Sequence, residues 1–147
     1  MDGNIVEILM VEDTDADAEL AMLALRERGF ANHLVRAKDG AEALEFLFGT
    51  GAYAGRNLAN LPKVVLLDLR LPKVSGVEVL RRMKADPRTR SVPVVVLTSS
   101  KEDIDLKECY KLSVNSYIAK PVTFDEFTKV VAEIGLYWLL VNRLPDP

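Results

Sequence analysis

Short apolar runs alternate with longer amphipathic segments along the chain. The apolar runs, three of them almost purely Val, Ile and Leu, cover residues 5–11, 34–35, 64–67, 92–97 and 117–119. Such runs are typical of parallel strands covered by helices on both faces. Between and after them, helices are predicted at about 15–29, 40–48, 76–85, 101–111 and 124–141. This alternation predicts a doubly wound α/β domain, because each parallel neighbour needs a right-handed crossover.

Local signals support these boundaries. Gly29 stands where the first helix should stop, and Asp86 followed by Pro87 should end the third. Thr123 and Glu126 have the spacing of a capping box that opens the last helix. Residues 49–62, GTGAYAGRNLANLP, are rich in Gly and Asn with weak periodicity, which predicts a surface loop.

Length, charge and cysteine content narrow the class of protein. The chain has 147 residues, enough for one domain with a hydrophobic core, so we expect a single domain over residues 1–147 with no output domain. A formal net charge of −3 gives no basic field for nucleic acid. The single cysteine suits a reducing compartment, and neither the pattern expected of a signal peptide nor an apolar run long enough to span a membrane is seen in these 147 residues. We therefore expect a cytoplasmic protein that binds neither nucleic acid nor membrane.

Polar residues follow four of the predicted strands. The first strand runs into Glu12 and Asp13, the third into Asp68, the fourth into Thr98 and the fifth into Lys120. In an open parallel sheet the carboxyl ends of the strands share one edge, and ligands bind there. The pattern therefore predicts three carboxylates, a hydroxyl and an ammonium group in one pocket.

This group of side chains favours a particular chemistry. Clustered carboxylates repel one another unless a cation lies among them. Oxygen ligands with no cluster of His or Cys favour Mg²⁺ over zinc or copper. With Mg²⁺ bound, Asp68 could attack a phosphoryl donor and form an aspartyl phosphate. Lys120 would pair with one phosphoryl oxygen, and Thr98 would donate a hydrogen bond to another.

Four segments of the chain resemble a known family. ILMVED at the first strand, LLDLRLPKVSG around Asp68, LTSS at Thr98 and SYIAKP at Lys120 are similar to the receiver domains of two-component response regulators. The resemblance covers nearly the whole chain, and the motifs occur in the family's order and spacing. It implies a flavodoxin-like (βα)5 fold, with a five-stranded parallel sheet in the order 2-1-3-4-5. It also implies a sensor histidine kinase as partner.

The resemblance assigns a role to each pocket residue. Asp68 would be the phosphoacceptor, and Mg²⁺ would be held by Glu12, Asp13, Asp68 and the main-chain carbonyl of Arg70. The side chain at Arg70 varies in the family and influences how long the phosphoryl group persists.

The remaining roles concern switching. Thr98 and Tyr117 would form the switch pair, in which Tyr117 turns inward once Thr98 moves toward a phosphoryl oxygen. Lys120 would bind phosphate, and Pro121 is expected in the cis form, which would aim Lys120 inward. The output surface would comprise the fourth helix, the fifth strand and the last helix.

Within the family, the chain looks most like the small regulators partnered with phytochrome-type histidine kinases. Two features carry this finer resemblance, the long loop over residues 49–62 and the ending that begins Tyr137-Trp138-Leu139. In addition, the final turns of the last helix are apolar nearly all round, which usually marks an interface. We therefore expect a homodimer through the fourth-helix, fifth-strand and last-helix face plus the C-terminal tail, where the extended C-terminal helix and tail together cover about 124–147. The alternative is that this tail folds back onto its own domain.

Simpler interpretations of the pocket residues remain open. Glu12 and Asp13 could simply begin an acidic first helix, because acidic residues favour helix N-termini. Thr98 could be an ordinary strand-end residue, and Lys120 a solvated lysine. Tyr117 could be a packing residue at the rim of the sheet.

Three other functions are compatible with parts of the pattern. An aspartyl phosphatase would use an Asp nucleophile with Mg²⁺, but the acid/base position two residues further on is Arg70 here. A flavodoxin-like cofactor binder would need a phosphate loop after the first strand, where this chain is acidic. A degenerate receiver could serve only in docking, although its pocket residues would then be unexplained.

Overall fold

The computed structural model describes residues 8–27 and 34–98, together with Lys107, Lys111, Leu112, residues 116–119, Asp125, Glu126 and Lys129. Residues 98 and 116–119 are described through their backbone alone. The strands are β1 (Ile8–Val11), β2 (Leu34–Ala37), β3 (Val64–Leu67), β4 (Val94–Thr98) and β5 (Ser116–Ala119). The helices are α1 (Asp15–Glu27), α2 (Gly40–Phe48), the short 3-10 helix η2 (Gly51–Tyr53) and α3 (Gly76–Ala85).

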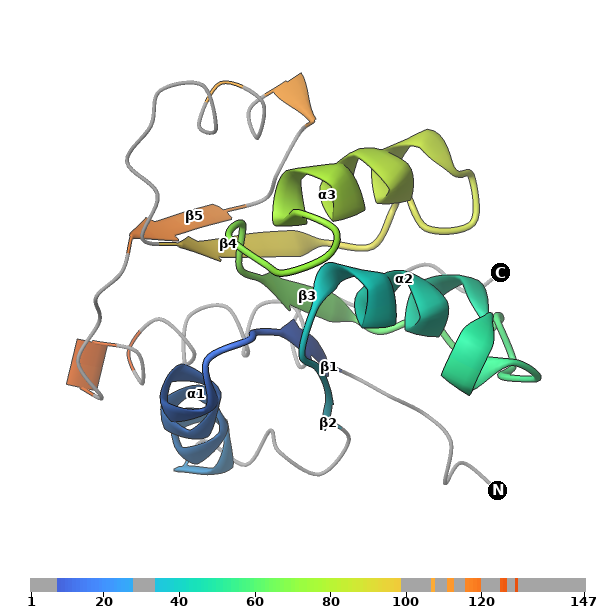
Figure 1. Cartoon of the computed structure of the whole chain (residues 1–147). Coiled ribbons are helices and arrows are strands. Elements are labelled where there is room, and N and C mark those ends of the chain that lie inside the picture. The colour runs from blue at the N-terminus through green and yellow to red at the C-terminus, as the bar shows by residue number, and fades with distance from the viewer. Residues whose placement is uncertain are drawn as a thin grey trace.

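The strands form one parallel sheet in the order β2-β1-β3-β4-β5, which confirms the predicted fold (Figure 1). Val11 is in register with Ala37 on one side and with Leu67 on the other. On the far side of β3, Thr98 at the end of β4 is in register with Ala119 at the end of β5. Because every pairing is parallel, the carboxyl ends of all five strands lie along one edge of the sheet.

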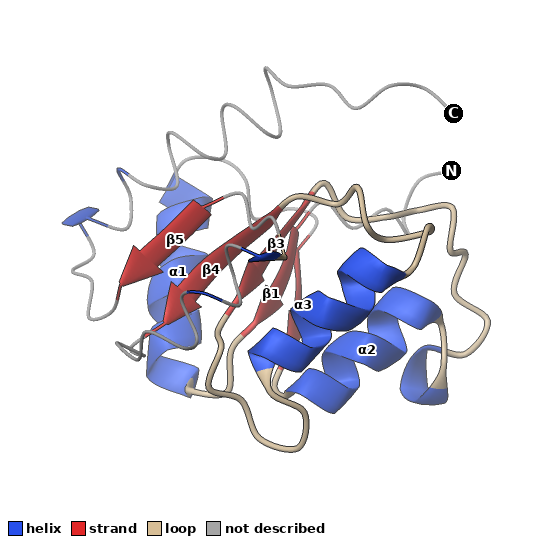
Figure 2. Ribbon diagram, turned by 90° about the horizontal axis from the view of Figure 1, so that it is seen from above, coloured by secondary structure: helices blue, strands red, loops and turns tan. Residues whose placement is uncertain are grey.

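The central strands are buried on both faces, which explains their continuous apolar sequence. One set of alternating side chains, with Leu9, Val65 and Val96, packs against α2 and α3. The other set, with Met10 and Leu66, packs against α1. Figure 2 shows α2 and α3 together on one side of the sheet and α1 on the other. The helices therefore complete a three-layer arrangement, and the two cores leave the carboxyl edge of the strands available for a site.

Local capping explains where the helices begin and end. Asp39 accepts a hydrogen bond from the Glu42 N–H at the start of α2, and Ser75 does the same for the Glu78 N–H at the start of α3. Gly49 ends α2 in the left-handed conformation, with φ of 66°. The predicted stop of the third helix is confirmed, because Asp86 is the C-terminal cap of α3.

Several predicted boundaries shift by a few residues. Strand β4 begins at Val94 rather than at residue 92, because the Val92 N–H donates to the Thr89 carbonyl in a turn and Pro93 has no N–H to donate. Strand β2 extends two residues further than predicted, to Ala37.

The loop over residues 49–62 contains the η2 turn and is held by Arg56. The Arg56 guanidinium lies 4.1 Å over the Phe46 ring, and its Nε donates to the Phe46 carbonyl. The expected loop is therefore confirmed, and it is anchored on α2.

Much of the C-terminal part of the prediction lies outside the described residues. Of the helices predicted at 101–111 and 124–141, Lys107, Lys111, Asp125, Glu126 and Lys129 are described, and all are helical. Gly29, Thr123, Lys120, Pro121 and the apolar end of the last helix fall outside the description.

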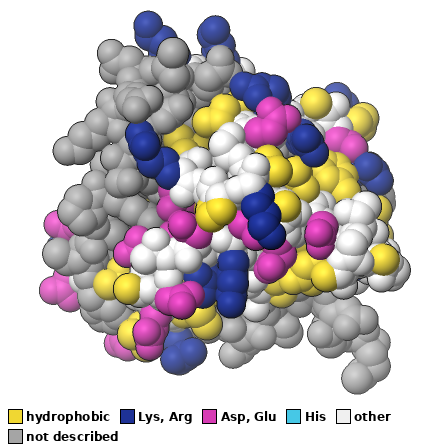
Figure 3. Space-filling model, viewed as in Figure 1, with side chains coloured by type: hydrophobic (Ala, Val, Ile, Leu, Met, Phe, Trp, Pro, Cys, Tyr) yellow, Lys and Arg dark blue, Asp and Glu magenta, His cyan; other side chains and the backbone are white. Residues whose placement is uncertain are grey.

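Acidic and basic side chains are interspersed on the face shown in Figure 3. That face carries no large surface of one charge among the described residues, in keeping with a formal net charge of −3. In the described part of the chain, no helix combines the length and apolar character needed to cross a membrane.

Candidate functional site

The carboxyl ends of β1 and β3 carry the predicted acidic residues side by side. The hydrogen-bonded ladder continues one residue past each strand, since the Asp68 N–H donates to the Val11 carbonyl at 3.0 Å and the Glu12 N–H donates to the Ala37 carbonyl at 3.0 Å. Glu12 and Asp68 are therefore held on the rigid edge of the sheet and not on a free loop.

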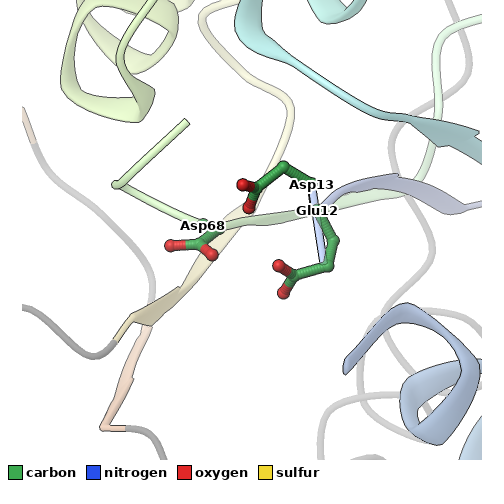
Figure 4. Close-up of side chains that lie close together, drawn as sticks. All are labelled: Glu12, Asp13 and Asp68. Atoms are coloured by element: carbon green, nitrogen blue, oxygen red, sulfur yellow. The ribbon is translucent and has the colours of Figure 1, made fainter. Parts of the chain in front are cut away.

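The three predicted carboxylates converge at this edge. Glu12, Asp13 and Asp68 each place one carboxylate oxygen so that the three atoms lie within 4.8 Å of one another (Figure 4). Glu12 and Asp68 are buried, with exposed fractions of 5% and 6%, whereas Asp13 is exposed to solvent. The cluster thus opens to solvent on the side of Asp13.

The burial of this cluster has an electrostatic consequence. Charged carboxylates so close together repel one another, and burial of two of them weakens their hydration. A hard divalent cation would offset both costs, and oxygen ligands of this kind suit Mg²⁺ or Mn²⁺. The carboxylate oxygens of Glu12, Asp13 and Asp68 therefore fit such an ion.

The segment after Asp68 folds back against the site. Oδ1 of Asp68 accepts a hydrogen bond of 3.1 Å from the Arg70 N–H, and the Gly76 N–H donates to the Leu69 carbonyl at 2.9 Å. The Arg70 side chain is exposed. These bonds hold the Asp68 carboxyl group in one orientation and seat α3 directly behind it.

The other predicted site residues are placed through the backbone of β4 and β5. Thr98 is the last residue of β4, and Tyr117 lies within β5, next in the sheet after β4. Both strands end at the same edge as β1 and β3, but the side chains of Thr98 and Tyr117 are outside the description. Lys120 directly follows the end of β5 in sequence. Lys120 and Pro121 lie outside the residues that the structure describes.

Sequence reasoning missed one residue beside the site, Arg36 in β2. Its Nε and Nη2 donate to the main-chain carbonyl of Glu12 at 3.0 and 2.9 Å, and its Nη1 donates to Oδ1 of Asp15 at 2.8 Å. This hydrogen bond and the charge of Arg36 lower the pKa of Asp15 below its usual value. The only signal in the sequence is an arginine inside a short apolar strand, LVRA.

The family of the chain follows from its similarity to known proteins. The model of the response regulator receiver domain family matches residues 8–132, and the chain belongs to this family. It is therefore a receiver domain of two-component signalling, and a sensor histidine kinase is its partner.

Two relatives of the chain are similar over nearly its whole length. The chain is 47% identical over 140 residues to the probable methanogenesis regulatory protein FilR2 of Methanothrix harundinacea, an alignment that covers 95% of this chain and 88% of FilR2. It is 38% identical over 138 residues to the response regulator Rcp1 of Synechocystis, covering 94% of this chain and 92% of Rcp1.

Two crystal structures of such regulators share the fold. The phosphorylated cyanobacterial phytochrome response regulator RcpA matches with a TM-score of 0.84 and 37% identity, covering 97% of this chain and 99% of RcpA. The Mn²⁺-bound form of Rcp1 matches with a TM-score of 0.82 and 37% identity, covering 95% of this chain and 98% of Rcp1. The chain is thus a homologue of phytochrome response regulators.

Proposed function

We propose that Asp68 accepts a phosphoryl group from a phosphohistidine of the partner kinase. An Asp68 oxygen forms a bond to phosphorus while the bond between phosphorus and the histidine nitrogen breaks, and that nitrogen leaves with the electron pair. The position of Asp68 carries this proposal, because it is buried at the strand edge with Glu12 and Asp13 beside it. The phosphorylated state of the similar RcpA supports it.

The carboxylates of Glu12, Asp13 and Asp68 and the Arg70 carbonyl would hold Mg²⁺. When bound, the ion neutralises charge on the acidic cluster and on the transferring phosphoryl oxygens. The convergence of the three carboxylates supports this ligand set, as does the Mn²⁺-bound form of Rcp1. The hydrogen bond from the Arg70 N–H orients the Asp68 carboxyl group for attack.

Thr98, Tyr117 and Lys120 would respond to the phosphorylation of Asp68. A phosphoryl group adds up to two negative charges and three acceptor oxygens. Thr98 donates a hydrogen bond to one oxygen, Lys120 pairs with another, and Tyr117 turns inward as Thr98 moves. A cis peptide bond before Pro121 would aim Lys120 into the pocket. The order of β4 and β5 beside β3 supports these roles.

Acetyl phosphate tests the acceptor directly. Wild-type protein incubated with acetyl phosphate and Mg²⁺ should gain the mass of one phosphoryl group, and Asp68→Asn should not. Asp86→Asn is the matched control, since it makes the same change at the end of α3, away from the carboxylate cluster. A phosphoryl adduct that persists in Asp68→Asn would refute the assignment.

More specifically, the proposed partner is a phytochrome-type histidine kinase. The chain would act with it in the cytoplasm. The anchored loop over residues 49–62 and the likeness to RcpA support this choice. The name of the similar protein FilR2 points instead to methanogenesis, so the identity of the kinase has to be tested. A purified phytochrome-type kinase should transfer its phosphoryl group to this chain within seconds to minutes. Transfer no faster than from acetyl phosphate would reject that kinase class.

Residues 1–147 would act as a single receiver domain that pairs with a second copy. The proposed dimer face combines the fourth helix, β5 and the last helix with its tail. The apolar sequence from Leu136 to Leu140 supports it. Sedimentation of the full chain should give a dimer, and Leu136→Asp with Leu139→Asp should give a monomer. A monomeric wild type at micromolar concentration would remove the dimer proposal.

A further inference from the structure

We propose that Arg36 is a positioning residue for the acidic cluster, because its guanidinium fixes the main chain from which Glu12 and Asp13 extend. Two nitrogens of this side chain, Nε and Nη2, bind the same Glu12 carbonyl oxygen at 3.0 and 2.9 Å. A third, Nη1, binds the Asp15 carboxylate at 2.8 Å. Arg36 therefore bridges the main chain before Asp13 and the first residue of α1. This inference rests on the proposed metal site.

Two consecutive residues of β2, Arg36 and Ala37, bind the main-chain carbonyl and the N–H of Glu12. Its N–H donates to the Ala37 carbonyl at 3.0 Å, and its carbonyl accepts from Arg36. With both groups occupied, the backbone of Glu12 has little freedom to rotate. The direction in which the chain continues into Asp13 is thereby fixed, as is the approach of both carboxylates to Asp68.

The charge of Arg36 lies beside the cluster without occupying its ligand atoms. Its hydrogen bonds go to a main-chain carbonyl and to Asp15, not to the carboxylates of Glu12, Asp13 or Asp68. The Arg36 side chain is only 18% exposed, whereas that of Asp15 is 88% exposed. Arg36 is thus a largely buried cation close to the acidic segment 12–17, and none of its hydrogen bonds occupies a carboxylate oxygen of the cluster.

The geometry requires an arginine. A guanidinium presents five N–H donors in a rigid fork, which allows two of them to meet one carbonyl oxygen while a third reaches a carboxylate. A lysine at this position keeps the charge but offers a single flexible ammonium group. Substitution by Lys therefore separates positioning from electrostatics, and substitution by Gln removes both.

Direct metal binding tests the inference without phosphorylation. Mn²⁺ titration of the full chain, followed by calorimetry or electron paramagnetic resonance, should show weaker binding in both Arg36→Lys and Arg36→Gln. We expect a loss of about 10-fold, which is typical when a residue that orients metal ligands is removed. Asp15→Asn is the matched control, since it removes the ion pair but keeps the hydrogen bonds of Arg36 to Glu12, and its affinity should stay within about twofold.

Two results would overturn the inference. Wild-type affinity in Arg36→Lys would show that the fork is not needed, and tighter binding in Arg36→Gln would show that the charge of Arg36 only repels the ion. Amide exchange in metal-free protein provides a second measurement, which does not depend on the fold of the Gln variant. Exchange of the Glu12 N–H should be faster in Arg36→Lys, and unchanged exchange would also overturn the inference. Failure of the wild type to bind Mn²⁺ would instead refute the proposed metal site.

Discussion

The α-carbon of Gly76 lies directly against the main-chain carbonyl of Asp68. A Cβ built on Gly76 would lie 2.2 Å from that oxygen and 2.5 Å from the Cα of Leu69. The Gly76 N–H also donates to the Leu69 carbonyl at 2.9 Å. The first residue of α3 is therefore packed onto the backbone that carries the proposed phosphoacceptor, and only a glycine allows this approach.

Substitution of Gly76 by Ala should destabilise the fold and disturb the acceptor site together. The new methyl group must displace backbone atoms, so we expect a loss of at least about 2 kcal/mol in the free energy of unfolding. Urea unfolding measures the loss, and the initial rate with acetyl phosphate should also fall. Gly55→Ala is the control, because Gly55 has φ of +89° but no heavy atom within 4 Å of its Cβ position. Its cost should be about 1 kcal/mol, from backbone strain alone. Equal losses in the two variants would show that the contact with Asp68 has no effect.

Magnesium should stabilise the folded protein through the acidic cluster. An ion that binds only the folded state at 100 times its Kd adds about 2.7 kcal/mol to the free energy of unfolding. Asp13 is an exposed member of the cluster, so Asp13→Asn should cost little stability in EDTA but lose most of the gain from Mg²⁺. Thermal unfolding with and without Mg²⁺ measures the difference. Asp17→Asn, in α1 and outside the cluster, should keep the full gain, and an equal gain in Asp13→Asn would contradict the ligand assignment.

Periodic patterns in the sequence were sufficient to predict a parallel sheet and the acidic cluster, whereas the strand order followed from the family resemblance. Continuous apolar strands such as VVLL are typical of parallel sheets covered on both faces, and the residues that follow parallel strands share one edge of the sheet. The sequence alone therefore indicates that Glu12, Asp13 and Asp68 lie together.

The supporting contacts could not be predicted in this way, because they depend on long-range geometry. Nothing in LVRA indicates that Arg36 reaches the carbonyl of Glu12, which is 24 residues away. The anchoring of Arg56 on Phe46 is likewise a contact between a loop and a helix that has no periodic signal. Sequence patterns indicate which side chains carry the chemistry but not which ones hold them.

The buried hydroxyl of Thr89 should contribute measurably to stability. Thr89 is fully buried, and its Oγ1 donates to the Met83 carbonyl in the last turn of α3 at 2.7 Å. Thr89→Val keeps the shape but leaves that carbonyl without its donor, so we expect a loss of about 1–3 kcal/mol. Thr89→Ser keeps the hydroxyl and should lose only about 1 kcal/mol for the missing methyl group. Urea unfolding compares the free energies of unfolding of the two variants. A larger loss in Thr89→Ser than in Thr89→Val would contradict the role of the hydrogen bond.

Lys73 adopts the left-handed conformation with φ of 68°, in the loop between β3 and α3. A β-branched residue is strained there, so Lys73→Val should lose about 1–2 kcal/mol. Lys73→Gly should change the stability by less than about 0.5 kcal/mol, because relief of strain offsets the greater freedom of the unfolded chain. The ion pair of Lys73 with Asp39, at 3.5 Å, has an exposed lysine and contributes little. Urea unfolding measures the stability of both variants. Equal stability of Lys73→Val and Lys73→Gly would argue against strain at this position.

The carboxyl group of Asp86 should titrate far below its usual range. Its pKa falls from 3.8 to about 2, first because the Arg88 side chain donates hydrogen bonds to it and then because the Arg88 N–H does so as well. Since the pKa is lowered in the folded state, the stabilisation is complete above the unfolded value near 3.8 and is lost as the pH falls through about 2.

Carboxyl carbon NMR should therefore show Asp86 still ionised at pH 3. In Arg88→Ala the pKa should rise toward 3.8 without reaching it, because the backbone N–H of residue 88 still donates. Arg90→Ala should leave the titration unchanged, and an equal rise in that variant would assign the shift to general charge and not to the hydrogen bonds from Arg88.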